Sequence, residues 1–287
     1  MVAQKRQGKN AMRFVRYGEP GREKPGMLDA EGRVRDLSGV VADISGAVLG
    51  GLPKLDPEKL PLVEGTPRLG PPVAGIGKLI GIGLNYSDHA AEIGIEPPAE
   101  PVVFMKATSS IVGPDDDVVL PRGSTHADWE VELGVVIGRE AKYVTEAEAL
   151  DHVAGYTIVN DVSERHFQIE CSGQWTKGKS CDTFGPVGPW LVTPEAVGNI
   201  QSLDMSADVS GERMQTGNTS TMIFTVAQII AHLSEVMRLE PGDIIATGTP
   251  PGVGMGRDPK RYLKPGDVME LQIQGLGRQR QTVRADP

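Results

Sequence analysis

The sequence predicts an α+β fold in which strands dominate. Six segments rich in Val and Ile have the alternating or continuous apolar pattern of strands, whereas one segment has a persuasive helical pattern. The strand-like segments do not alternate regularly with helices, which argues against a doubly wound parallel sheet. They are residues 78–86, 101–107, 128–138, 155–161, 243–248 and 267–275.

Composition narrows the class of protein. The chain has 287 residues and is 39% hydrophobic, enough for one large domain or two modest ones with a packed core. Its formal net charge is -9 and no block of Lys and Arg stands out, so neither nucleic acid nor an anionic membrane is an expected partner. The expected partner is a small molecule.

The two cysteines and the N-terminal residues indicate the cellular compartment in which the protein is expected to work. Cys171 and Cys181 have no zinc-site spacing and do not suggest a disulfide framework, which favours a reducing cytoplasm. The N-terminus lacks the apolar core of a signal peptide, and no stretch approaches the roughly 18 apolar residues of a membrane span. We therefore expect a cytoplasmic protein without a membrane segment.

Residues 1–72 are expected to form a small N-terminal domain, with residues 1–11 as a tail. "MRFVRYG" and "MLDAEGRVRDLSGV" follow, and the second predicts two strands joined through a Glu-Gly turn. Residues 62–78 are dense in Gly and Pro and are the best linker candidate. The remaining residues, 73–287, are expected to form a second, larger domain, which contains all the candidate site residues described below.

The helix is predicted over "TVAQIIAHLSEVMRL", which begins at Thr225. Thr225 and Gln228 have capping-box spacing. An apolar stripe with helical spacing follows, and Pro241 comes after it.

"DWEVELGVVIG" places Glu130 and Glu132 on one face of a strand, because successive side chains of a strand point to opposite faces. A half-buried strand with a wet acidic face would explain this pattern equally well. Asp161, at the end of the apolar strand "GYTIVND", adds a third carboxylate. Three carboxylates without His or Cys favour a hard cation, Mg²⁺ or Mn²⁺, with coordination positions left for water and substrate.

"GLNYSDHAAEIG" contains His89 and Glu92. If a helix starts near Ser87, the two side chains share a face, and the carboxylate can orient the imidazole so that the pair activates water. A chance pair on a solvated helix is the alternative. Gly81, Gly83 and Gly94 flank the pair and suggest a mobile segment that closes over a ligand.

"GQWTKGKSCDTFGPVGPW" gathers Lys177 and Lys179 in an otherwise stiff stretch. A lysine beside a metal-bound oxyanion would stabilise charge as it develops in a transition state. In a strand both lysines would face the same way, so the residues alone do not choose between them, and two solvated lysines are the plainer interpretation.

Further polar residues could contact a substrate. Arg165 and Gln168, three apart in "SERHFQ", would share a face if this segment is helical, and could bind a carboxylate or carbonyl oxygen. "ATGTPPGVG" offers backbone N–H groups and the hydroxyl of Thr249, but it is not a P-loop. Cys171 and Cys181 have no evident base partner, which argues against thiol catalysis.

Taken together and in order, these motifs resemble the fumarylacetoacetate hydrolase family over about residues 76–280. The resemblance implies packed mixed β-sheets with few helices, and usually a homodimer. It also assigns roles: metal carboxylates, Glu130, Glu132 and Asp161; a water-activating dyad on a lid, His89 and Glu92; the catalytic lysine, Lys179; and substrate contacts, Arg165, Gln168 and Thr249. Cys181 departs from the aromatic residue that many members carry at this point.

The resemblance implies Mg²⁺-dependent or Mn²⁺-dependent cleavage of a carbon–carbon bond in a small anionic 2,4-dioxo acid, with release of pyruvate. The residues of these motifs are most similar to those of bacterial hydrolases that act on 2,4-diketo-3-deoxy sugar acids. Oxaloacetate decarboxylase, hydroxymuconate-type isomerase and ureidoglycolate lyase are alternative activities for the same site. A catalytically silent metal-binding scaffold is an alternative of another class, although such a protein would have no use for a water-activating pair.

Overall fold

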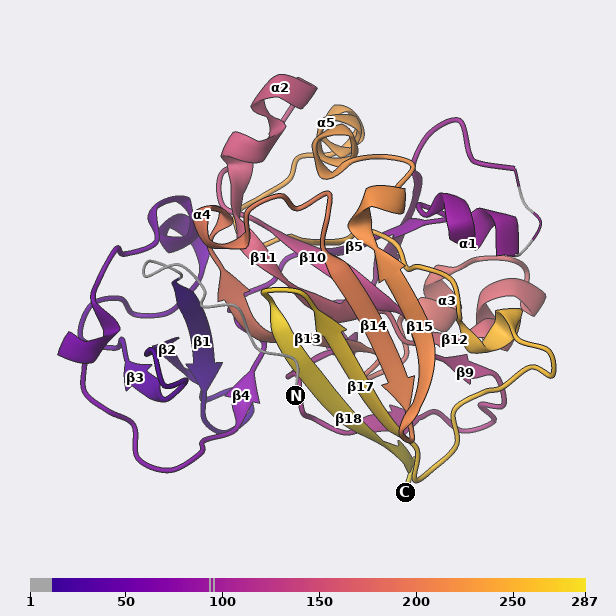
Figure 1. The fold of residues 1–287 in the computed structure, drawn as a ribbon, viewed down its shortest axis with the longest axis horizontal. Helices are drawn as coiled ribbons and strands as arrows, with labels where there is room; N and C mark the ends of the chain where they lie inside the picture. The colour runs from indigo at the N-terminus through magenta and orange to yellow at the C-terminus, as the bar shows by residue number, and fades with distance from the viewer. Residues whose placement is uncertain (1–11, 93, 95) are drawn as a thin grey trace.

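Strands make up most of the regular structure in the computed structural model, which describes residues 12–92, 94 and 96–287. The tail expected over residues 1–11 lies outside the described residues. Two large mixed sheets pack against each other, and helices lie mainly at the ends of the strands (Figure 1). The expectation of a mainly β, α+β fold is therefore confirmed.

The larger sheet has eleven strands among the described residues, and both parallel and antiparallel neighbours. Its main path runs in the order β3-β2-β1-β13-β11-β10-β16-β5-β6, while β4 pairs with β1 and β7 with β13. The strands are β1 (Arg13–Tyr17), β2 (Lys24–Leu28), β3 (Val34–Asp36), β4 (Leu69–Gly70), β5 (Leu79–Gly83), β6 (Val102–Lys106), β7 (Ile111–Val112), β10 (Val131–Ile137), β11 (Val153–Asn160), β13 (Gly185–Val192) and β16 (Ile244–Ala246).

The second sheet has five strands in the order β15-β14-β17-β18-β8, and a separate pair joins β12 to β9. One apolar cluster holds side chains from β10 and β11 together with side chains from β14 and β17, so the main core lies between the two large sheets. The strands are β8 (Val118–Leu120), β9 (Ala127–Asp128), β12 (Ser163–Glu164), β14 (Asp204–Val209), β15 (Glu212–Asn218), β17 (Val268–Ile273) and β18 (Gly277–Ala285).

The N-terminal strands are continuous with the larger sheet. β1 pairs antiparallel with β13, where Phe14 lies opposite Leu191. Phe14 and Leu191 also belong to one buried cluster with Val136 and Ile244. The Gly- and Pro-rich segment before residue 78 contributes β4, which pairs with β1. A separate small N-terminal domain is therefore not confirmed, and its boundary near residue 72 stays a prediction.

The longest described helix, α5 (Val226–Val236), begins where the sequence predicts. Thr225 and Gln228 form a complete capping box, and Ile229, Ile230 and Leu233 are fully buried. The other helices are short. They are the α-helices α1 (Ser87–Glu92), α2 (Glu146–Ala149), α3 (Thr176–Lys179) and α4 (Pro194–Val197), the 3₁₀ turns η1 (Gly46–Gly51), η2 (Pro57–Lys59), η3 (Thr108–Ser110), η4 (Leu150–His152), η6 (Thr219–Thr221) and η7 (Gly254–Gly256), and the π-turn η5 (His166–Glu170).

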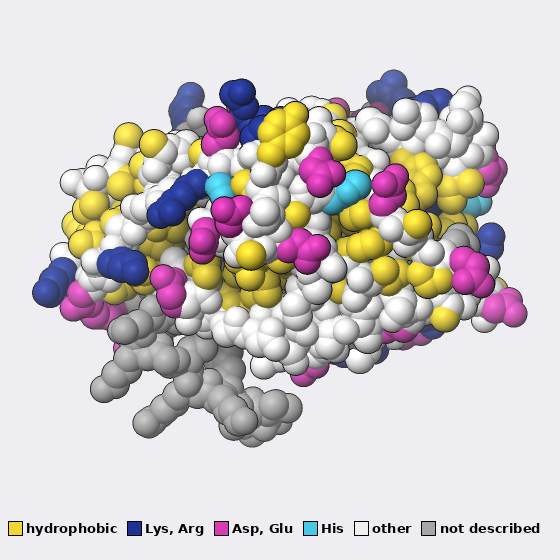
Figure 2. Space-filling view, turned by 90° about the horizontal axis from the view of Figure 1, so that it is seen from above, with side chains coloured by type: hydrophobic (Ala, Val, Ile, Leu, Met, Phe, Trp, Pro, Cys, Tyr) yellow, Lys and Arg dark blue, Asp and Glu magenta, His cyan; other side chains and the backbone are white. Residues whose placement is uncertain are grey.

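The outer surface agrees with the acidic composition. On the face shown in Figure 2, Asp and Glu side chains are dispersed among hydrophobic and neutral ones, and most Lys and Arg side chains lie toward the outline. Among the described residues, no helix has both the length and the hydrophobicity needed to cross a bilayer.

Candidate functional site

Three carboxylates converge where β10 and β11 lie side by side. Glu130 directly precedes β10, Glu132 lies within it, and Asp161 directly follows β11. Each residue offers one carboxylate oxygen such that these oxygens lie within 4.8 Å of one another, and all three residues are buried. The interpretation of this strand as a wet acidic face is therefore wrong.

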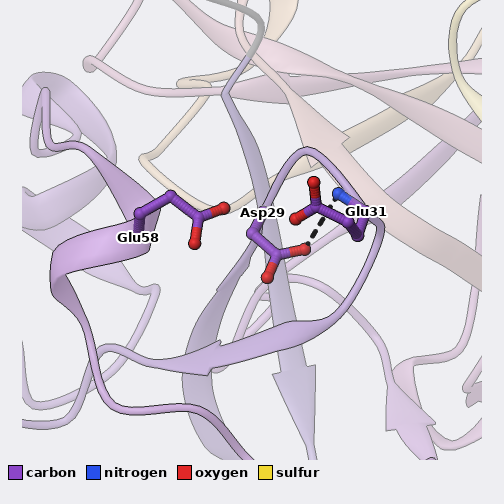
Figure 3. A group of neighbouring side chains, drawn as sticks. All are labelled: Asp29, Glu31 and Glu58. Atoms are coloured by element: carbon purple, nitrogen blue, oxygen red, sulfur yellow. Dashed lines mark hydrogen bonds between the residues drawn. The ribbon is translucent and has the colours of Figure 1, made fainter.

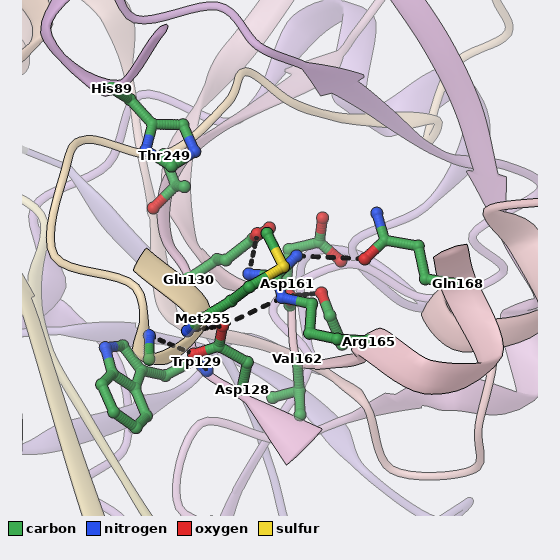
Figure 4. A network of polar contacts seen from close by, with 12 residues as sticks. His89, Asp128, Trp129, Glu130, Asp161, Val162, Arg165, Gln168, Thr249 and Met255 are labelled. Atoms are coloured by element: carbon green, nitrogen blue, oxygen red, sulfur yellow. Dashed lines mark hydrogen bonds and ion pairs between the residues drawn. The ribbon is translucent and has the colours of Figure 1, made fainter. Parts of the chain in front are cut away.

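Two lysines and an arginine neutralise these carboxylates. The Lys179 ammonium donates to Glu130 Oε2 at 2.7 Å and to Asp161 Oδ2 at 2.6 Å. Lys106 donates to the other oxygen of Asp161 at 2.6 Å. Arg165 Nη2 donates to Glu130 Oε1 at 2.6 Å (Figure 4). Each oxygen of Glu130 and of Asp161 thus has a cationic partner.

The charges act differently on the two glutamates. Burial raises the pKa of Glu130, but Lys179 and Arg165 outweigh burial and lower this pKa to about 2. Burial also raises the pKa of Glu132, and the carboxylates of Asp161 and Glu130 raise it further, well above its ordinary value. Burial and the two neighbouring carboxylates both disfavour negative charge on Glu132, and an additional cation would offset these effects.

The stretch that carries Lys177 and Lys179 folds as the short helix α3, not as a strand. The two lysines therefore point in different directions, because residues two apart lie on opposite sides of a helix. Lys179 is buried among the carboxylates. Lys177 is exposed and donates to the carbonyl oxygen of Cys171 at 3.1 Å. The structure thus separates two residues that their spacing left equivalent, and the lysine it places at the carboxylates is the one that the family resemblance indicates.

His89 and Glu92 form a pair on α1, as their spacing predicts. His89 Nδ1 lies 2.9 Å from Glu92 Oε2. The other oxygen of Glu92 accepts a hydrogen bond from the Gly252 N–H at 3.0 Å. The carboxylate is therefore held on both sides, which fixes the direction of the imidazole ring.

Arg165 and Gln168 also contact each other, because Arg165 directly precedes the turn η5. Arg165 Nη1 donates to Gln168 Oε1 at 3.1 Å, and Arg165 Nε donates to Asp128 Oδ2 at 2.9 Å. Burial lowers the pKa of Arg165, but Glu130 and Asp128 outweigh burial and raise it above its ordinary value. Figure 4 shows these side chains across the site from His89 and Thr249.

The segment 248–255 binds side chains from two other segments through its backbone. The Gly248 N–H donates to Glu132 Oε2 at 2.8 Å. The N–H groups of Gly254 and Met255 donate to the two oxygens of Asp128 at 2.7 and 3.0 Å. Together with the Gly252 contact to Glu92, these bonds make the loop a shared support for the site.

Thr249 lies within this loop and is almost fully buried. Its hydroxyl donates to the Val131 carbonyl oxygen at 3.0 Å and accepts from Gln215 Nε2 at 2.8 Å. Thr249 therefore also connects the loop to β10 and β15.

These groups line one cavity of about 620 Å³, a volume that includes the space at its open mouth. Its polar lining residues are His89, Glu130, Glu132, Arg165, Gln168, Lys179 and Thr249. Ile82, Leu84, Phe104, Ile169, Trp175 and Met255 form its apolar lining. Of the nine residues predicted for the site, seven line this cavity, and the other two, Asp161 and Glu92, join it through Lys179 and His89.

Two glycines of β5 make room for the aromatic part of the lining. A Cβ at Gly81 would lie 2.1 Å from the Phe104 ring, and a Cβ at Gly83 would lie 2.4 Å from the Trp175 ring. The Lys179 ammonium lies 4.8 Å from the centre of the Phe104 ring. The glycines thus serve packing beside the site.

Lys106 and Asp128 also belong to the site, although neither was predicted from the sequence. Lys106 ends the apolar strand β6 and has no exposed side-chain surface, and Asp128 begins the acidic motif and is fully buried. For Lys106, a charged residue at the end of an apolar strand was the available signal, whereas Asp128 ends the two-residue strand β9, which gives no such signal.

A second acidic group lies in the N-terminal part of the structure (Figure 3). Its members are Asp29, Glu31 and Glu58. Arg33 donates to Asp29 at 2.9 Å and to Glu31 at 3.0 Å, and Arg35 donates to Glu58 at 2.7 Å. Each carboxylate has an arginine partner and two of the three residues are exposed, so this group is an ion-pair cluster.

Of the two acidic groups found among the described residues, the buried one lies at the cavity and is the candidate for a catalytic cation site. Glu130, Glu132 and Asp161 could hold a divalent ion by oxygen atoms alone, which suits Mg²⁺ and Mn²⁺. The raised pKa of Glu132 fits this interpretation, because a cation would relieve the repulsion among the carboxylates.

Comparisons with known proteins agree with this arrangement. Residues 78–284 match the family model described as "Fumarylacetoacetate (FAA) hydrolase C-terminal". A protein of Sphingomonas sp. (strain SKA58) named 2,4-didehydro-3-deoxy-L-rhamnonate hydrolase is 60% identical over 273 residues, which are 95% of this chain and 96% of that protein.

Solved structures are similar over nearly the whole chain. A fumarylacetoacetate hydrolase from Exiguobacterium antarcticum matches with a TM-score of 0.86 and 36% identity, over 96% of this chain and 100% of that one. A 2-hydroxyhepta-2,4-diene-1,7-dioate isomerase from Mycobacterium marinum matches with a TM-score of 0.75 and 34% identity, over 96% and 99%. The chain belongs to the fumarylacetoacetate hydrolase family of enzymes.

Proposed function

We propose that the protein is a divalent-metal-dependent hydrolase that cleaves a carbon–carbon bond of a 2,4-dioxo acid and releases pyruvate. The observation that carries the proposal is the convergence of three buried carboxylates, the His89–Glu92 pair and Lys179 around one cavity. A water-activating pair beside a cationic group is what addition of water to a carbonyl requires.

Glu130, Glu132 and Asp161 would hold the cation, Mg²⁺ or Mn²⁺. When bound, this ion supplies positive charge that favours an anionic oxo acid and its enolate. The chain's own residues supply the other functions.

His89 is the proposed general base. Its Nδ1–H donates to Glu92 Oε2 at 2.9 Å, which leaves Nε2 to accept a proton from water. The water oxygen adds to the C4 carbonyl carbon, and the C3–C4 bond then breaks. The two electrons of that bond stay with the three-carbon fragment, which takes up a proton and becomes pyruvate. Glu92 stabilises the imidazolium while the proton resides on His89.

Lys179 is the proposed electrostatic catalyst. Its buried ammonium can donate a hydrogen bond to an oxygen that gains negative charge, where a low local dielectric strengthens the interaction. Arg165, Gln168 and Thr249 are the proposed substrate contacts. Asp128 holds Arg165 in place through the bond to its Nε.

The substrate we propose is a 2,4-diketo-3-deoxy sugar acid or a related acylpyruvate. The relative named 2,4-didehydro-3-deoxy-L-rhamnonate hydrolase supports this class, since it is 60% identical over nearly the full length of both chains. Hydrolysis of such a six-carbon acid between C3 and C4 would yield pyruvate and lactate.

Turnover of a panel of acids tests the proposal. Purified protein with Mg²⁺ should release pyruvate from acylpyruvates or 2,4-diketo-3-deoxy acids, measured by coupling to lactate dehydrogenase. Chelation of the metal and His89→Ala should each abolish most of this release. Absence of pyruvate across the whole panel would overturn the proposal.

An isomerase is the second candidate, because a structural relative with 34% identity is named 2-hydroxyhepta-2,4-diene-1,7-dioate isomerase. This activity would shift the ultraviolet absorption of a hydroxymuconate-type diene without forming pyruvate. The same protein preparation can be assayed for both signals, so the two candidates are separable.

A further inference from the structure

We propose that the mouth of the cavity selects oxo acids with an uncharged tail and rejects acids with a second carboxylate at the far end. This inference rests on the proposed function and narrows its substrate class. It follows from how polar and apolar residues are distributed between the floor and the mouth of the cavity.

The polar lining lies deep in the cavity. Its most exposed member, His89, has 7% of its surface accessible, and Glu132 and Lys179 have 2% each. Among the described lining residues, the side chains that reach the surface are instead apolar: Leu84, Trp175 and Met255 are half-buried, and Ile169 is 48% exposed. An acid whose carboxylate and oxo groups reach the floor would therefore place its tail among apolar side chains.

Each basic side chain in the described lining already has an acidic partner. Arg165 is bound to Asp128 and Glu130, and Lys179 is bound to Glu130 and Asp161. His89 is paired with Glu92 in the same way. Asp128, Glu130 and Asp161 are buried at the floor, whereas Glu92 is exposed, so the mouth offers a second carboxylate no unpaired cation among its described lining residues.

The free energy of binding should therefore depend on the end group of the acid. A methyl end group would gain from contact with Ile169, Trp175 and Met255, since apolar surface is removed from water. A carboxylate in the same place would lose part of its hydration without gaining an ion pair. Both effects favour the uncharged tail.

Two acids of equal length isolate the effect of the end group: 2,4-dioxoheptanoate ends in a methyl group, and 2,4-dioxoheptanedioate ends in a carboxylate. We would measure their dissociation constants by calorimetry with the His89→Ala protein and Mg²⁺, so that turnover does not interfere. The uncharged tail is expected to bind about 30-fold more tightly. The kcat/KM values of the wild-type enzyme should differ in the same direction.

A cation introduced at the mouth should reduce this preference. Ile169→Lys, combined with His89→Ala, is expected to tighten binding of the dicarboxylate by about fivefold. Ile169 is 48% exposed, so the added ammonium remains solvated in the free protein. Ile169→Gln is the matched control, because it adds polarity without charge and should leave the dicarboxylate weakly bound.

The outcomes separate the inference from the proposed function. Equal or tighter binding of the dicarboxylate by the protein with Ile169 intact would overturn the inference alone, as would an equal response to Lys and Gln at position 169. Preferential binding of the monocarboxylate without pyruvate release by the wild type would support the inference and overturn the hydrolase proposal. Failure of both acids to bind would overturn both.

Discussion

Asp161 is held by two lysines, Lys106 from the strand β6 and Lys179 from the helix α3. The Lys106 ammonium donates to Oδ1 of Asp161 and the Lys179 ammonium donates to Oδ2, each at 2.6 Å. Lys106 also donates to the Val162 carbonyl oxygen at 3.0 Å, and it does not line the cavity. Lys106 is thus a buried structural partner of Asp161, whereas Lys179 faces the space where a substrate would lie.

Removal of Lys106 should therefore destabilise the fold. Lys106→Met leaves one oxygen of the buried Asp161 without its cation, and the free energy of unfolding should fall by about 3 kcal/mol. Denaturant titration monitored by circular dichroism measures this change. Lys177→Met is the control, because Lys177 is exposed and should change stability by less than about 0.5 kcal/mol. Equal effects of the two substitutions would contradict the assignment.

The two lysines of α3 should differ in catalysis as they do in position. Lys179→Met should lower kcat for pyruvate release by about 1,000-fold, because a buried cation next to developing charge is lost. Lys177→Met should leave kcat nearly unchanged, since its ammonium binds a backbone carbonyl outside the cavity. Steady-state kinetics of the two proteins check this, and a large loss in Lys177→Met would argue against the proposed role of Lys179.

Several residues of the site could be predicted from short-range rules. Strand alternation placed Glu130 and Glu132 on one face, and helical spacing paired His89 with Glu92. Lys106 and Asp128 were not predicted, because their partners, Asp161 and Arg165, are 55 and 37 residues away in sequence. The periodicity of a strand or a helix gives no information about contacts between residues so far apart in sequence.

At the scale of elements, β5 and β6 form the aromatic wall of the site. Gly81 lies directly opposite Phe104 across the pair of strands, and the ring of Phe104 covers the place of the missing side chain. This is close packing that a larger residue would disturb.

Gly81→Ala should therefore destabilise the protein by about 2 kcal/mol, because the new methyl group would overlap the Phe104 ring. Thermal and denaturant unfolding measure the change. Gly39→Ala is the matched control, since a Cβ at this exposed position meets no atom within 4 Å. Similar losses from both substitutions would indicate an effect of alanine itself instead of overlap with Phe104.

Elements with strong local signals were predictable, and very short ones were not. The capping box and the apolar stripe of α5 are formed by residues close together in sequence, so the sequence indicates where this helix begins. The four-residue helix α3 has no such signal, and Trp175 and Gly178 do not distinguish it from a strand or a turn. Its fold depends on contacts that form only in the complete protein.

At the scale of the whole molecule, the proposed metal site ties distant parts of the chain together. Glu130 and Glu132 come from the β10 segment and Asp161 comes from the end of β11, so a bound cation would join two neighbouring strands. Binding to the folded state alone stabilises that state by mass action.

Mg²⁺ should therefore raise the midpoint of thermal unfolding. At a free concentration of about 100 times the dissociation constant, the added stability is about 2.7 kcal/mol. Asp161→Asn should remove most of this response, measured for each protein with and without Mg²⁺. Glu31→Gln, in the exposed ion-pair cluster, should retain it. A response that survives in Asp161→Asn but is lost in Glu31→Gln would place the ion elsewhere.

The joining of the N-terminal strands to the larger sheet could not be predicted from sequence. β1 pairs with β13, and Arg13 lies opposite Val192, far along the chain. Hydrophobic alternation predicts that a strand exists but not which strand it joins. The Gly- and Pro-rich segment 62–78 suggested a boundary between independent units, whereas its strand β4 adds to the same sheet.

The contacts of the loop 248–255 limit which changes of its sequence the protein can tolerate. Its backbone N–H groups bind Glu92 of α1 and also Asp128 and Glu132, which lie close together in the acidic motif. All three N–H donors belong to glycines, where an added Cβ would lie 2.8 Å or less from a neighbouring atom, so larger residues at these positions would disturb the anchors. Insertion or deletion of a residue between two anchors would shift them out of register with each other. The arrangement therefore depends both on the length of this loop and on glycine at the three anchor positions.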